Sequence, residues 1–448
     1  MAEKHYLIKT YGCQMNVHES EKLAGMMKSL GYEETTDINN ANIIVFNTCC
    51  IRDGAEQKIY AHIGALKNIK KNNKDLIVAV CGCLSQAEGR AEEIKRKFPF
   101  VNIIIGTHNI HLFKEYLETY LQNKKFICDV WDKEKEINEN VDMFRTSGKN
   151  AWVNISYGCN NFCSYCIVPY VRGRERSRDI NEILAEIKCL AKSGYKYITL
   201  LGQNVNSYGN DLEDKDINFV NLLRKASKIE GDFKIKFMTS HPKDLTEEVI
   251  EEIAKNDKLA KVIHLPVQSG NNRILNLMNR RYTREKYLGL INSIREKIPN
   301  AVLTTDIIVG FPSETEEEFM DTYNLVKEVR YDSIFAFMYS KRSNTPAEKM
   351  ENQVPIETKR DRVNRLLGLS KTITKEINKN LIGRIFNTTF DYLEDDLAFF
   401  ETDSGKTLIV ENAGSKFDKS KFYQIKVSKE KNNKLFGEII DDARWKTN

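Results

Sequence analysis

The 448-residue sequence has no apolar run close to the roughly 20 residues that a membrane-spanning helix needs. Its first residues lead directly into Tyr6-Leu7-Ile8, without the apolar region of a signal peptide. These two absences predict that the protein has no membrane contact and works in the cytoplasm. The net charge of +5 is small, so charge alone permits a nucleic-acid partner without favouring one.

Disulfide bonds are not expected either, although the sequence contains 10 cysteines. In a reducing compartment, cysteines more often bind metals or take part in catalysis than pair with each other. The hydrophobic content of 41% and the charged content of 29% are typical of a globular protein with an ample core. A chain of 448 residues is expected to contain two or three domains.

A fourth ligand is missing from the most informative segment. Cys159, Cys163 and Cys166 follow a C-x3-C-x2-C spacing, and no further cysteine or histidine follows at ligand spacing. An iron–sulfur cube normally binds four thiolates, one for each iron, so three cysteines leave one iron open. An open metal position accepts a cofactor or a substrate. S-adenosylmethionine fits, because its amino and carboxylate groups can chelate that iron and an electron from the cube can break its carbon–sulfur bond.

Two simpler interpretations of this segment are a zinc knuckle that lacks one ligand and cysteines buried as small hydrophobic side chains. The spacing favours the radical cluster over zinc, because zinc sites usually contain paired C-x2-C units. The sequence therefore predicts a cluster on Cys159, Cys163 and Cys166 that binds S-adenosylmethionine.

Residues 4–125 alternate between short β-branched runs and amphipathic stretches. This alternation predicts an α/β domain with a doubly wound parallel sheet. The expected strands are Tyr6–Thr10, Ile43–Asn47, Leu76–Val80 and Val101–Gly106, and the expected helices include Glu19–Leu30, Gly54–Ile69 and Gln86–Lys97.

Three cysteines follow the first three of these strands. Cys13, Cys49 and Cys83 each lie just beyond a carboxyl end, and the crevice outside those ends is where such sheets bind ligands. The sequence thus predicts a second cluster with a free iron. The alternative is that buried cysteines happen to end strands. Cys50 and Cys81 neighbour the proposed ligands and Cys81 is not excluded as one, whereas Cys128 and Cys189 are expected to be packing residues.

A second strand–helix series begins at Ala151, after a charged connector over residues 126–150. Six repeats within residues 145–375 predict an open, partial (β/α)6 barrel, whose active site lies at the carboxyl ends of its strands. Cys159 follows the first strand, as this requires. The expected strands are Trp152–Ser156, Tyr197–Leu201, Lys234–Met238, Val262–Leu265, Leu303–Val309 and Ile334–Met338.

Polar residues near these strand ends are candidates for contacts with the cofactor or for a base. They are Gln203, Gln268 and Asp306, of which Asp306 could equally be a core carboxylate with satisfied hydrogen bonds. His241 and His264 are expected in a second layer, because the cysteines already account for two metal centres.

Four arginines follow the cluster segment at alternate positions: Arg172, Arg174, Arg176 and Arg178. In an extended chain, alternate residues share a face, so the four would form a row that can bind phosphates bidentately. The usual alternative is a solvated run of charge. Arg280-Arg281 is a weaker second candidate.

The last stretch, over residues 378–445, has short β-rich segments and turns that predict a small antiparallel β-barrel. Lysines such as Lys419 and Lys421 alternate here with aromatic residues, a composition that suits single-stranded or looped RNA. Acidic residues such as Glu394-Asp395-Asp396 offset much of this charge.

Three motifs are specific enough to indicate a family: Tyr11-Gly12-Cys13-Gln14-Met15-Asn16, Asn47-Thr48-Cys49-Cys50-Ile51-Arg52-Asp53, and the run from Cys159 to Tyr170. With them the chain resembles, nearly end to end, the methylthiotransferase family of radical S-adenosylmethionine enzymes. The resemblance implies an amino-terminal domain with an auxiliary cluster, a radical core and a carboxyl-terminal TRAM-like barrel. The sequence departs from the family pattern at Cys50, where serine or alanine is usual, and at Gly405-Lys406-Thr407, where Gly-Arg-Thr is usual.

The resemblance is greatest to the branch that makes 2-methylthio-N6-dimethylallyladenosine in tRNA. It implies two 4Fe–4S clusters, with Tyr165 near the adenine of S-adenosylmethionine and with sulfur on the auxiliary cluster. One S-adenosylmethionine would methylate that sulfur, and a second would give the radical that activates the 2-position of the adenine next to the anticodon. The arginine row and the barrel would hold the anticodon stem–loop, whose unpaired bases are easily presented.

The family also predicts an electron donor and a sulfur donor of unknown identity, and we expect a monomer. Sibling branches act on threonylcarbamoyladenosine in tRNA or on a ribosomal protein, and either is an alternative. An alternative of a different class is a non-catalytic iron–sulfur protein that binds RNA.

Overall fold

A computed structural model describes residues 4–50, 55–133, 143–145, 148–411 and 417–440 of the chain. It divides into two compact units. The first unit comprises residues 1–146, 156–162 and 166–178, and the second comprises residues 147–155, 163–165 and 179–448. The segment around the C-x3-C-x2-C spacing therefore contributes to both units. Ile51-Arg52-Asp53 of the second sequence motif lie outside the described residues.

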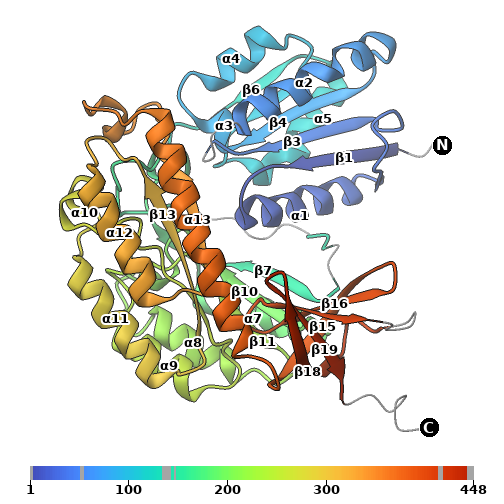
Figure 1. The fold of residues 1–448 in the computed structure, drawn as a ribbon. Helices are drawn as coiled ribbons and strands as arrows, with labels where there is room; N and C mark the ends of the chain where they lie inside the picture. The colour runs from blue at the N-terminus through green and yellow to red at the C-terminus, as the bar shows by residue number, and fades with distance from the viewer. Residues whose placement is uncertain (1–3, 51–54, 134–142, 146–147, 412–416, 441–448) are drawn as a thin grey trace. The chain divides into compact units, whose positions relative to one another are not determined.

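The first unit is built on a six-stranded parallel sheet in the order β2-β1-β3-β4-β5-β6 (Figure 1). The prediction of a parallel α/β sheet is confirmed. Its strands are β1 Lys4–Thr10, β2 Tyr32–Glu34, β3 Ile43–Thr48, β4 Ile77–Gly82, β5 Ile103–Ile105 and β6 Ile127–Asp129. The sequence analysis did not predict β2 and β6, which have 3 residues each. β6 falls inside the expected connector.

Helices cover both faces of this sheet because successive strand residues point to opposite sides. On one face, Ile43 and Val45 pack with α1 and α5, while on the other Ile44 and Phe46 pack with α2 and α4. The helices are α1 Gln14–Ser29, α2 Ala55–Asn72, α3 Cys83–Gln86, α4 Arg90–Lys97 and α5 Phe113–Asn123. α1 begins five residues before the predicted Glu19, directly after Cys13. The first unit also contains β8 Ser156–Tyr157, α6 Val168–Arg172 and β9 Arg176–Ser177.

The second unit contains the six predicted strands of the partial barrel. They form two parallel sheets, β11-β10-β7 and β12-β13-β14, and a single bridge between Ile235 and Leu259 joins them. The strands are β7 Asn150–Asn154, β10 Tyr197–Leu201, β11 Lys234–Phe237, β12 Val262–His264, β13 Val302–Val309 and β14 Ser333–Met338. Each lies within two residues of its predicted bounds.

Amphipathic helices follow these strands and cover their outer side (Figure 1). They are α7 Ile180–Lys192, α8 Phe219–Ser227, α9 Glu247–Lys255, α10 Asn272–Leu277, α11 Arg284–Lys297 and α12 Glu316–Val329, and the long α13 Ile356–Lys379 leads to the carboxyl-terminal barrel. Side-chain caps start several of them, including the capping box of Thr315 and Glu318 on α12.

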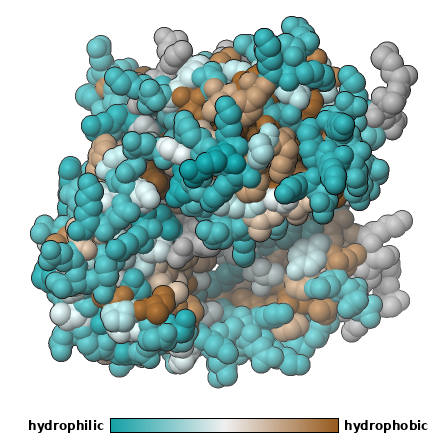
Figure 2. Space-filling view, turned by 90° about the horizontal axis from the view of Figure 1, so that it is seen from above, coloured by the Kyte–Doolittle hydropathy of each residue, from teal (hydrophilic) through white to brown (hydrophobic). Residues whose placement is uncertain are grey.

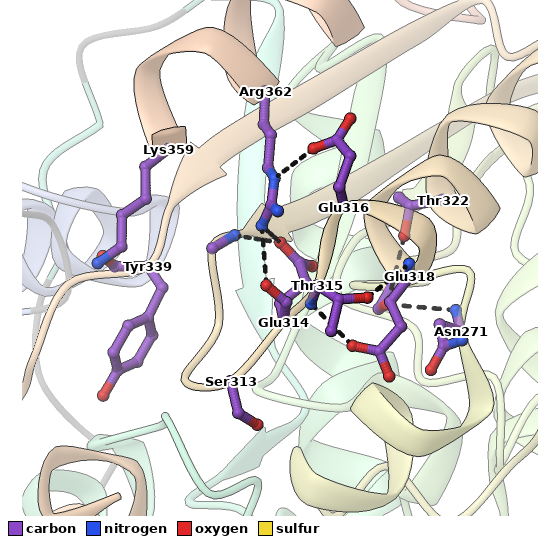
Figure 3. A network of polar contacts seen from close by, with 12 residues as sticks. Asn271, Ser313, Glu314, Thr315, Glu316, Glu318, Thr322, Tyr339, Lys359 and Arg362 are labelled. Carbon is purple, nitrogen blue, oxygen red and sulfur yellow. Dashed lines mark hydrogen bonds and ion pairs between the residues drawn. The ribbon is translucent and has the colours of Figure 1, made fainter. Parts of the chain in front are cut away.

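Helix α13 fixes the loop after β13 through a buried ion pair. The Arg362 guanidinium donates to the Glu314 carboxylate at 2.7 Å, and the Gly310 amide donates to the same oxygen at 2.6 Å (Figure 3). Burial raises the pKa of Glu314 to about 7, although both donors favour its ionised form. The network anchors one loop at the carboxyl end of the core strands.

A closed five-stranded barrel ends the described chain, in the order β15-β16-β17-β19-β18. Its strands are β15 Ile385–Glu394, β16 Leu397–Thr402, β17 Thr407–Glu411, β18 Phe422–Lys431 and β19 Lys434–Ile439. The expectation of a wholly antiparallel barrel is wrong, because β17 and β19 pair in parallel through Leu408–Leu435 and Ile409–Phe436. Closure needs this pairing, since β18 lies between β15 and β19 and leaves β17 to meet β19 directly.

Ion pairs fix the barrel to the core within the second unit. The Glu401 carboxylate of β16 forms ion pairs with Lys149 at 3.0 Å and with Lys236 at 3.0 Å. Lys149 also forms an ion pair with Asp391 at 2.8 Å. Hydrophilic side chains cover much of the face in Figure 2, with separate hydrophobic patches. Among the described residues, no helix combines the length and apolar character needed to cross a bilayer.

Candidate functional site

Three cysteines of the first unit stand where neighbouring parallel strands end. Cys13 lies between β1 and α1, Cys49 follows β3, and Cys83 is the first residue of α3 directly after β4. β3 lies between β1 and β4, with Thr10 level with Asn47 and Thr48 level with Gly82. The loops that carry Cys13, Cys49 and Cys83 therefore leave the same edge of the sheet.

Two glycines allow these loops to touch. A Cβ on Gly12 would lie 2.5 Å from the Cβ of Cys49 and 2.8 Å from its Sγ. A Cβ on Gly82 would lie 2.7 Å from the Thr48 amide nitrogen, and Gly82 has a φ of 97° that other residues rarely adopt. Both glycines are thus required for the close approach of the cysteine-bearing loops.

Asparagine side chains hold the same loops together. The Asn16 amide donates to the carbonyl oxygens of Tyr11 at 2.7 Å and Thr48 at 2.9 Å. The Asn47 amide donates to the Asn16 carbonyl at 2.8 Å. These buried bonds connect the loop of Cys13 to that of Cys49, which is a structural role for the two motif asparagines.

A buried arginine, Arg172, lies among the thiols. Its guanidinium donates to the Glu19 carboxylate at 2.7 Å and to the Asn16 side-chain oxygen at 2.8 Å. The same Asn16 oxygen accepts from the Cys13 thiol at 3.9 Å, and the charge of Arg172 acts on Cys83. Arg172 and Glu19 are each only 4% exposed. The positive charge of Arg172 also interacts with Cys13.

The thiols in this group differ in their acidity. A hydrogen bond from Cys50, helped by the Arg172 charge and opposed by burial, lowers the pKa of Cys83 to about 7. The pKa of Cys50 is correspondingly raised, by that hydrogen bond and by burial. Burial and the Glu19 charge raise the pKa of Cys81, which packs among apolar side chains. The local charges therefore favour a thiolate at Cys83 rather than at Cys81.

The chemistry of this donor set fits an iron–sulfur cluster, since thiolates are the usual cluster ligands and a cation beside them offsets their charge. No three Cys, His, Asp or Glu side chains in the described parts of the chain stand at the spacing of a formed metal site. The structure brings the three cysteine loops together, and their assignment as ligands stays a prediction.

The C-x3-C-x2-C segment contributes Cys159 and Cys166 to the first unit and Cys163 to the second. In the first unit, the Cys159 amide donates to the Gly173 carbonyl at 3.2 Å. In the second, Ser164 bonds through its amide to the Met278 carbonyl at 3.1 Å. Because these cysteines belong to two units, the joint arrangement of the three thiols stays a prediction.

A second buried arginine, Arg280, supports the part of this segment in the second unit. Its guanidinium donates to the Cys163 sulfur at 3.3 Å and to the Pro266 carbonyl at 2.9 Å. It also reaches the hydroxyl oxygens of Tyr282 at 3.0 Å and Tyr165 at 3.5 Å. Tyr165, predicted near the adenine, is thus linked to the same arginine as a proposed cluster ligand.

Of the other predicted polar residues, Gln203 and Gln268 follow strands, whereas Asp306 lies inside one. Gln268 has a φ of 67°, and its buried Oε1 has no hydrogen-bond partner among the described residues. Asp306 lies within β13, 3.6 Å from the His264 ring nitrogen, and Gln203 follows β10. His241 is buried against Tyr282, and burial lowers its pKa to about 2, which agrees with a neutral second-layer residue.

The expected extended row of four arginines is wrong at Arg172. That residue ends helix α6 and is buried, as is Arg178, whereas Arg174 is exposed and Arg176 is half-buried. Lys419 and Lys421 are exposed just before β18. Cys128 and Cys189 are also exposed rather than packed, since β6 is an edge strand and Cys189 lies on the outer side of α7.

Sequence reasoning missed Glu19 and the contacts of Arg172 and Arg280 with cysteines. Arg172 was noticed only as part of a charge run, and Arg280 only as half of a pair. Their proximity to the cysteines arises from tertiary contacts between distant segments, and the sequence carried no direct signal of it.

Two family models match parts of this chain. The model of the radical SAM superfamily matches residues 153–326, and that of the uncharacterized protein family UPF0004 matches residues 5–106. Among solved structures, the radical S-adenosylmethionine methyltransferase TsrM from Kitasatospora setae has a TM-score of 0.55 at 13% identity, over 78% of this chain and 77% of that one. This likeness shows a shared fold.

Curated relatives match over nearly the whole chain. A tRNA-2-methylthio-N(6)-dimethylallyladenosine synthase from Clostridium tetani is 53% identical, covering 97% of this chain and 96% of that protein. A protein of the same name from Clostridium perfringens strain 13 is 49% identical, covering 98% of this chain and 99% of that protein.

Proposed function

This chain belongs to the methylthiotransferase family of radical S-adenosylmethionine enzymes, and we propose that it is the tRNA-2-methylthio-N6-dimethylallyladenosine synthase of its cell. The reaction adds a methylthio group to the 2-position of the prenylated adenine next to the anticodon. The observation that carries this proposal is the meeting of the Cys13, Cys49 and Cys83 loops around one buried cation, in the same chain as a C-x3-C-x2-C segment.

The proposed ligands form two sets. Cys159, Cys163 and Cys166 would hold one 4Fe–4S cluster, and Cys13, Cys49 and Cys83 would hold the other. When bound, the first cluster with S-adenosylmethionine supplies a carbon radical, and the second carries the sulfur to be transferred. The low pKa of Cys83, about 7, favours the thiolate that metal binding requires.

Residues of the chain bind and orient the groups around these ligands. Arg280 holds Cys163 and Tyr165 through one guanidinium, which fixes the side of the loop that would receive S-adenosylmethionine. The buried Oε1 of Gln268 is a hydrogen-bond acceptor available to that cofactor, and Asp306 beside His264 is available as a base or polar contact.

The RNA contacts are proposed from three exposed cations and the half-buried Arg176. Arg174, Arg176, Lys419 and Lys421 would bind phosphates of the anticodon stem–loop, since such contacts position RNA without reading its sequence. The barrel is fixed to the core through Glu401, so its lysines would hold the RNA in one orientation. A tRNA substrate supports a cytoplasmic location, and an electron donor and a sulfur donor would be further partners.

Mass spectrometry of tRNA nucleosides tests the proposal. A host without this gene should accumulate N6-dimethylallyladenosine and lack its 2-methylthio derivative, and the gene should restore the derivative. Restoration by the Cys13→Ala variant, or a deletion host that keeps the derivative, would reject the proposal. Loss of a methylthio group from threonylcarbamoyladenosine instead would assign the chain to the sibling branch.

A further inference from the structure

One charged residue of the first unit has no assigned role in the reaction, although it lies among the proposed ligands. Arg172 ends helix α6, a short helix that begins two residues after Cys166. Ile167 and Val171 of the same segment pack into the apolar cluster that contains Cys50 and Cys83. The chain that leaves one cluster motif thus inserts a guanidinium beside the ligands of the other.

The charges around Arg172 are arranged for more than a simple ion pair. Glu19 neutralises one positive charge through contacts at 2.7 Å and 3.3 Å. Asn16 accepts a third bond at 2.8 Å, with the same side-chain oxygen that accepts from the Cys13 thiol at 3.9 Å. The guanidinium charge also acts on Cys83. A guanidinium has five N–H donors in a fixed plane, so it can serve a carboxylate and a sulfur together. Glu19 and Asn16 orient the guanidinium, and the neighbouring Val171 packs into the apolar cluster that contains Cys83.

A buried ion pair elsewhere in the chain provides a comparison. Arg362 and Glu314 are also almost fully buried, and the described bonds of Arg362 go to the Glu314 carboxylate and carbonyl and to Glu316. That pair joins a helix to a loop. The Arg172 pair differs because the charge of its arginine also acts on Cys83 and Cys13.

We propose that Arg172, held by Glu19 and Asn16, is a positioning residue that donates a hydrogen bond to the auxiliary cluster and offsets the negative charge of its thiolates. The proposal rests on the proposed function, because it needs a cluster on Cys13, Cys49 and Cys83. Arg172 raises the reduction potential of that cluster, since a nearby cation and a hydrogen bond to sulfur both stabilise the more reduced, more negative state.

The negative charge of Glu19 should have the opposite effect on the reduction potential of the cluster. Glu19 cancels part of the field of Arg172 at the thiols. Replacing Glu19 by glutamine keeps a side chain of the same shape and removes the negative charge. The two substitutions should therefore move the potential in opposite directions, which a purely structural role for the pair does not predict.

The experiment uses the full chain with Cys159, Cys163 and Cys166 replaced by alanine, so that only the auxiliary cluster is present. After anaerobic reconstitution, iron per chain is measured and the cluster potential is obtained from a redox titration followed by electron paramagnetic resonance. Arg172→Gln should lower the reduction potential of the cluster. It should also weaken iron binding by about 10- to 100-fold in affinity, measured as iron per chain at limiting iron supply. Glu19→Gln should raise the potential. Arg172→Lys should recover most of the parent potential, because it keeps the charge.

Arg96→Gln is the matched control, since Arg96 is an exposed arginine on α4 of the same unit. This variant should change neither the iron bound per chain nor the reduction potential of the cluster. Equal potentials in the parent, Arg172→Gln and Glu19→Gln proteins would overturn the inference. If Arg172→Gln is not recovered folded, Arg172→Lys and Glu19→Gln decide by the same measurement. A parent protein that binds no iron would instead reject the proposed function, so the two failures are distinguishable.

Discussion

Each unit of the chain buries an arginine against a cysteine, and the two arginines are balanced differently. Arg172 of the first unit pairs with the Glu19 carboxylate, and its charge acts on Cys83. Arg280 of the second unit donates instead to the Cys163 sulfur, the Pro266 carbonyl and tyrosine hydroxyls. The first arrangement is close to neutral before any ligand binds, whereas the second presents a positive charge.

This difference suits the two groups that the sites are proposed to hold. A buried cation that is not paired with a carboxylate is costly unless an anion joins it. When bound, S-adenosylmethionine would bring a carboxylate that can pair with Arg280, a kind of partner that Arg172 already has in Glu19. The following predictions test this contrast, from the largest expected effect to the smallest.

Replacing one proposed ligand of each cluster should separate the roles of the two clusters completely. Cys159→Ala should abolish formation of 5′-deoxyadenosine, because the first cluster can no longer bind. Cys13→Ala should retain that formation and lose the methylthio product. Both products are measured by mass spectrometry after anaerobic reaction with a reductant. Cleavage by the Cys159→Ala enzyme would refute its assignment as a ligand.

A buried arginine whose described hydrogen bonds go to glutamates shows what structure alone contributes. Arg362→Ala leaves the Glu314 carboxylate buried without its partner and should cost about 3–5 kcal/mol of unfolding free energy. Arg360→Ala on the same helix removes only an exposed pair with Glu357 and should cost less than about 1 kcal/mol. Denaturant unfolding measures both. Equal losses would mean that burial does not set the strength of these arginine contacts.

The approach of the cysteine loops in the first unit depends on Gly12. Gly12→Ala places a Cβ against Cys49 and should cost about 3 kcal/mol through strain and overpacking, together with the loss of auxiliary iron. Gly31→Ala is the control, because Gly31 also has a positive φ of 78° but has no atom within 4 Å of an added Cβ. It should cost about 1–2 kcal/mol from backbone conformation and leave the iron unchanged. Full iron retention by Gly12→Ala would contradict the proposed convergence.

The charge at Arg280 should appear in cofactor binding. Arg280→Gln should reduce the rate of 5′-deoxyadenosine formation or the affinity for S-adenosylmethionine by about 10- to 100-fold. Equilibrium dialysis gives the affinity, and Arg273→Gln on the nearby helix α10, an exposed residue paired with Glu318, provides the control. An unchanged affinity and rate in Arg280→Gln would remove the proposed distinction between the two regions.

The sequence predicted the features that local patterns determine. The β-branched runs at Ile43–Thr48 and Val302–Val309 became strands, and the cysteines after β1, β3 and β4 fell on one edge because parallel strands end together. It failed where tertiary context decides. Arg172 was expected in an extended row, but Pro169 at the start of α6 favours a helical turn, and Glu19 and Cys83 provide buried partners that no local pattern indicates.

Iron content of three purified proteins tests the central claim most directly. After anaerobic reconstitution, the wild-type chain should bind about eight irons, in two cubes of four. The variant with Cys13, Cys49 and Cys83 replaced by alanine should keep about four, and so should the variant with Cys159, Cys163 and Cys166 replaced. A wild-type chain with only about four irons, or either variant that keeps all eight, would contradict the account of two separate cysteine sets.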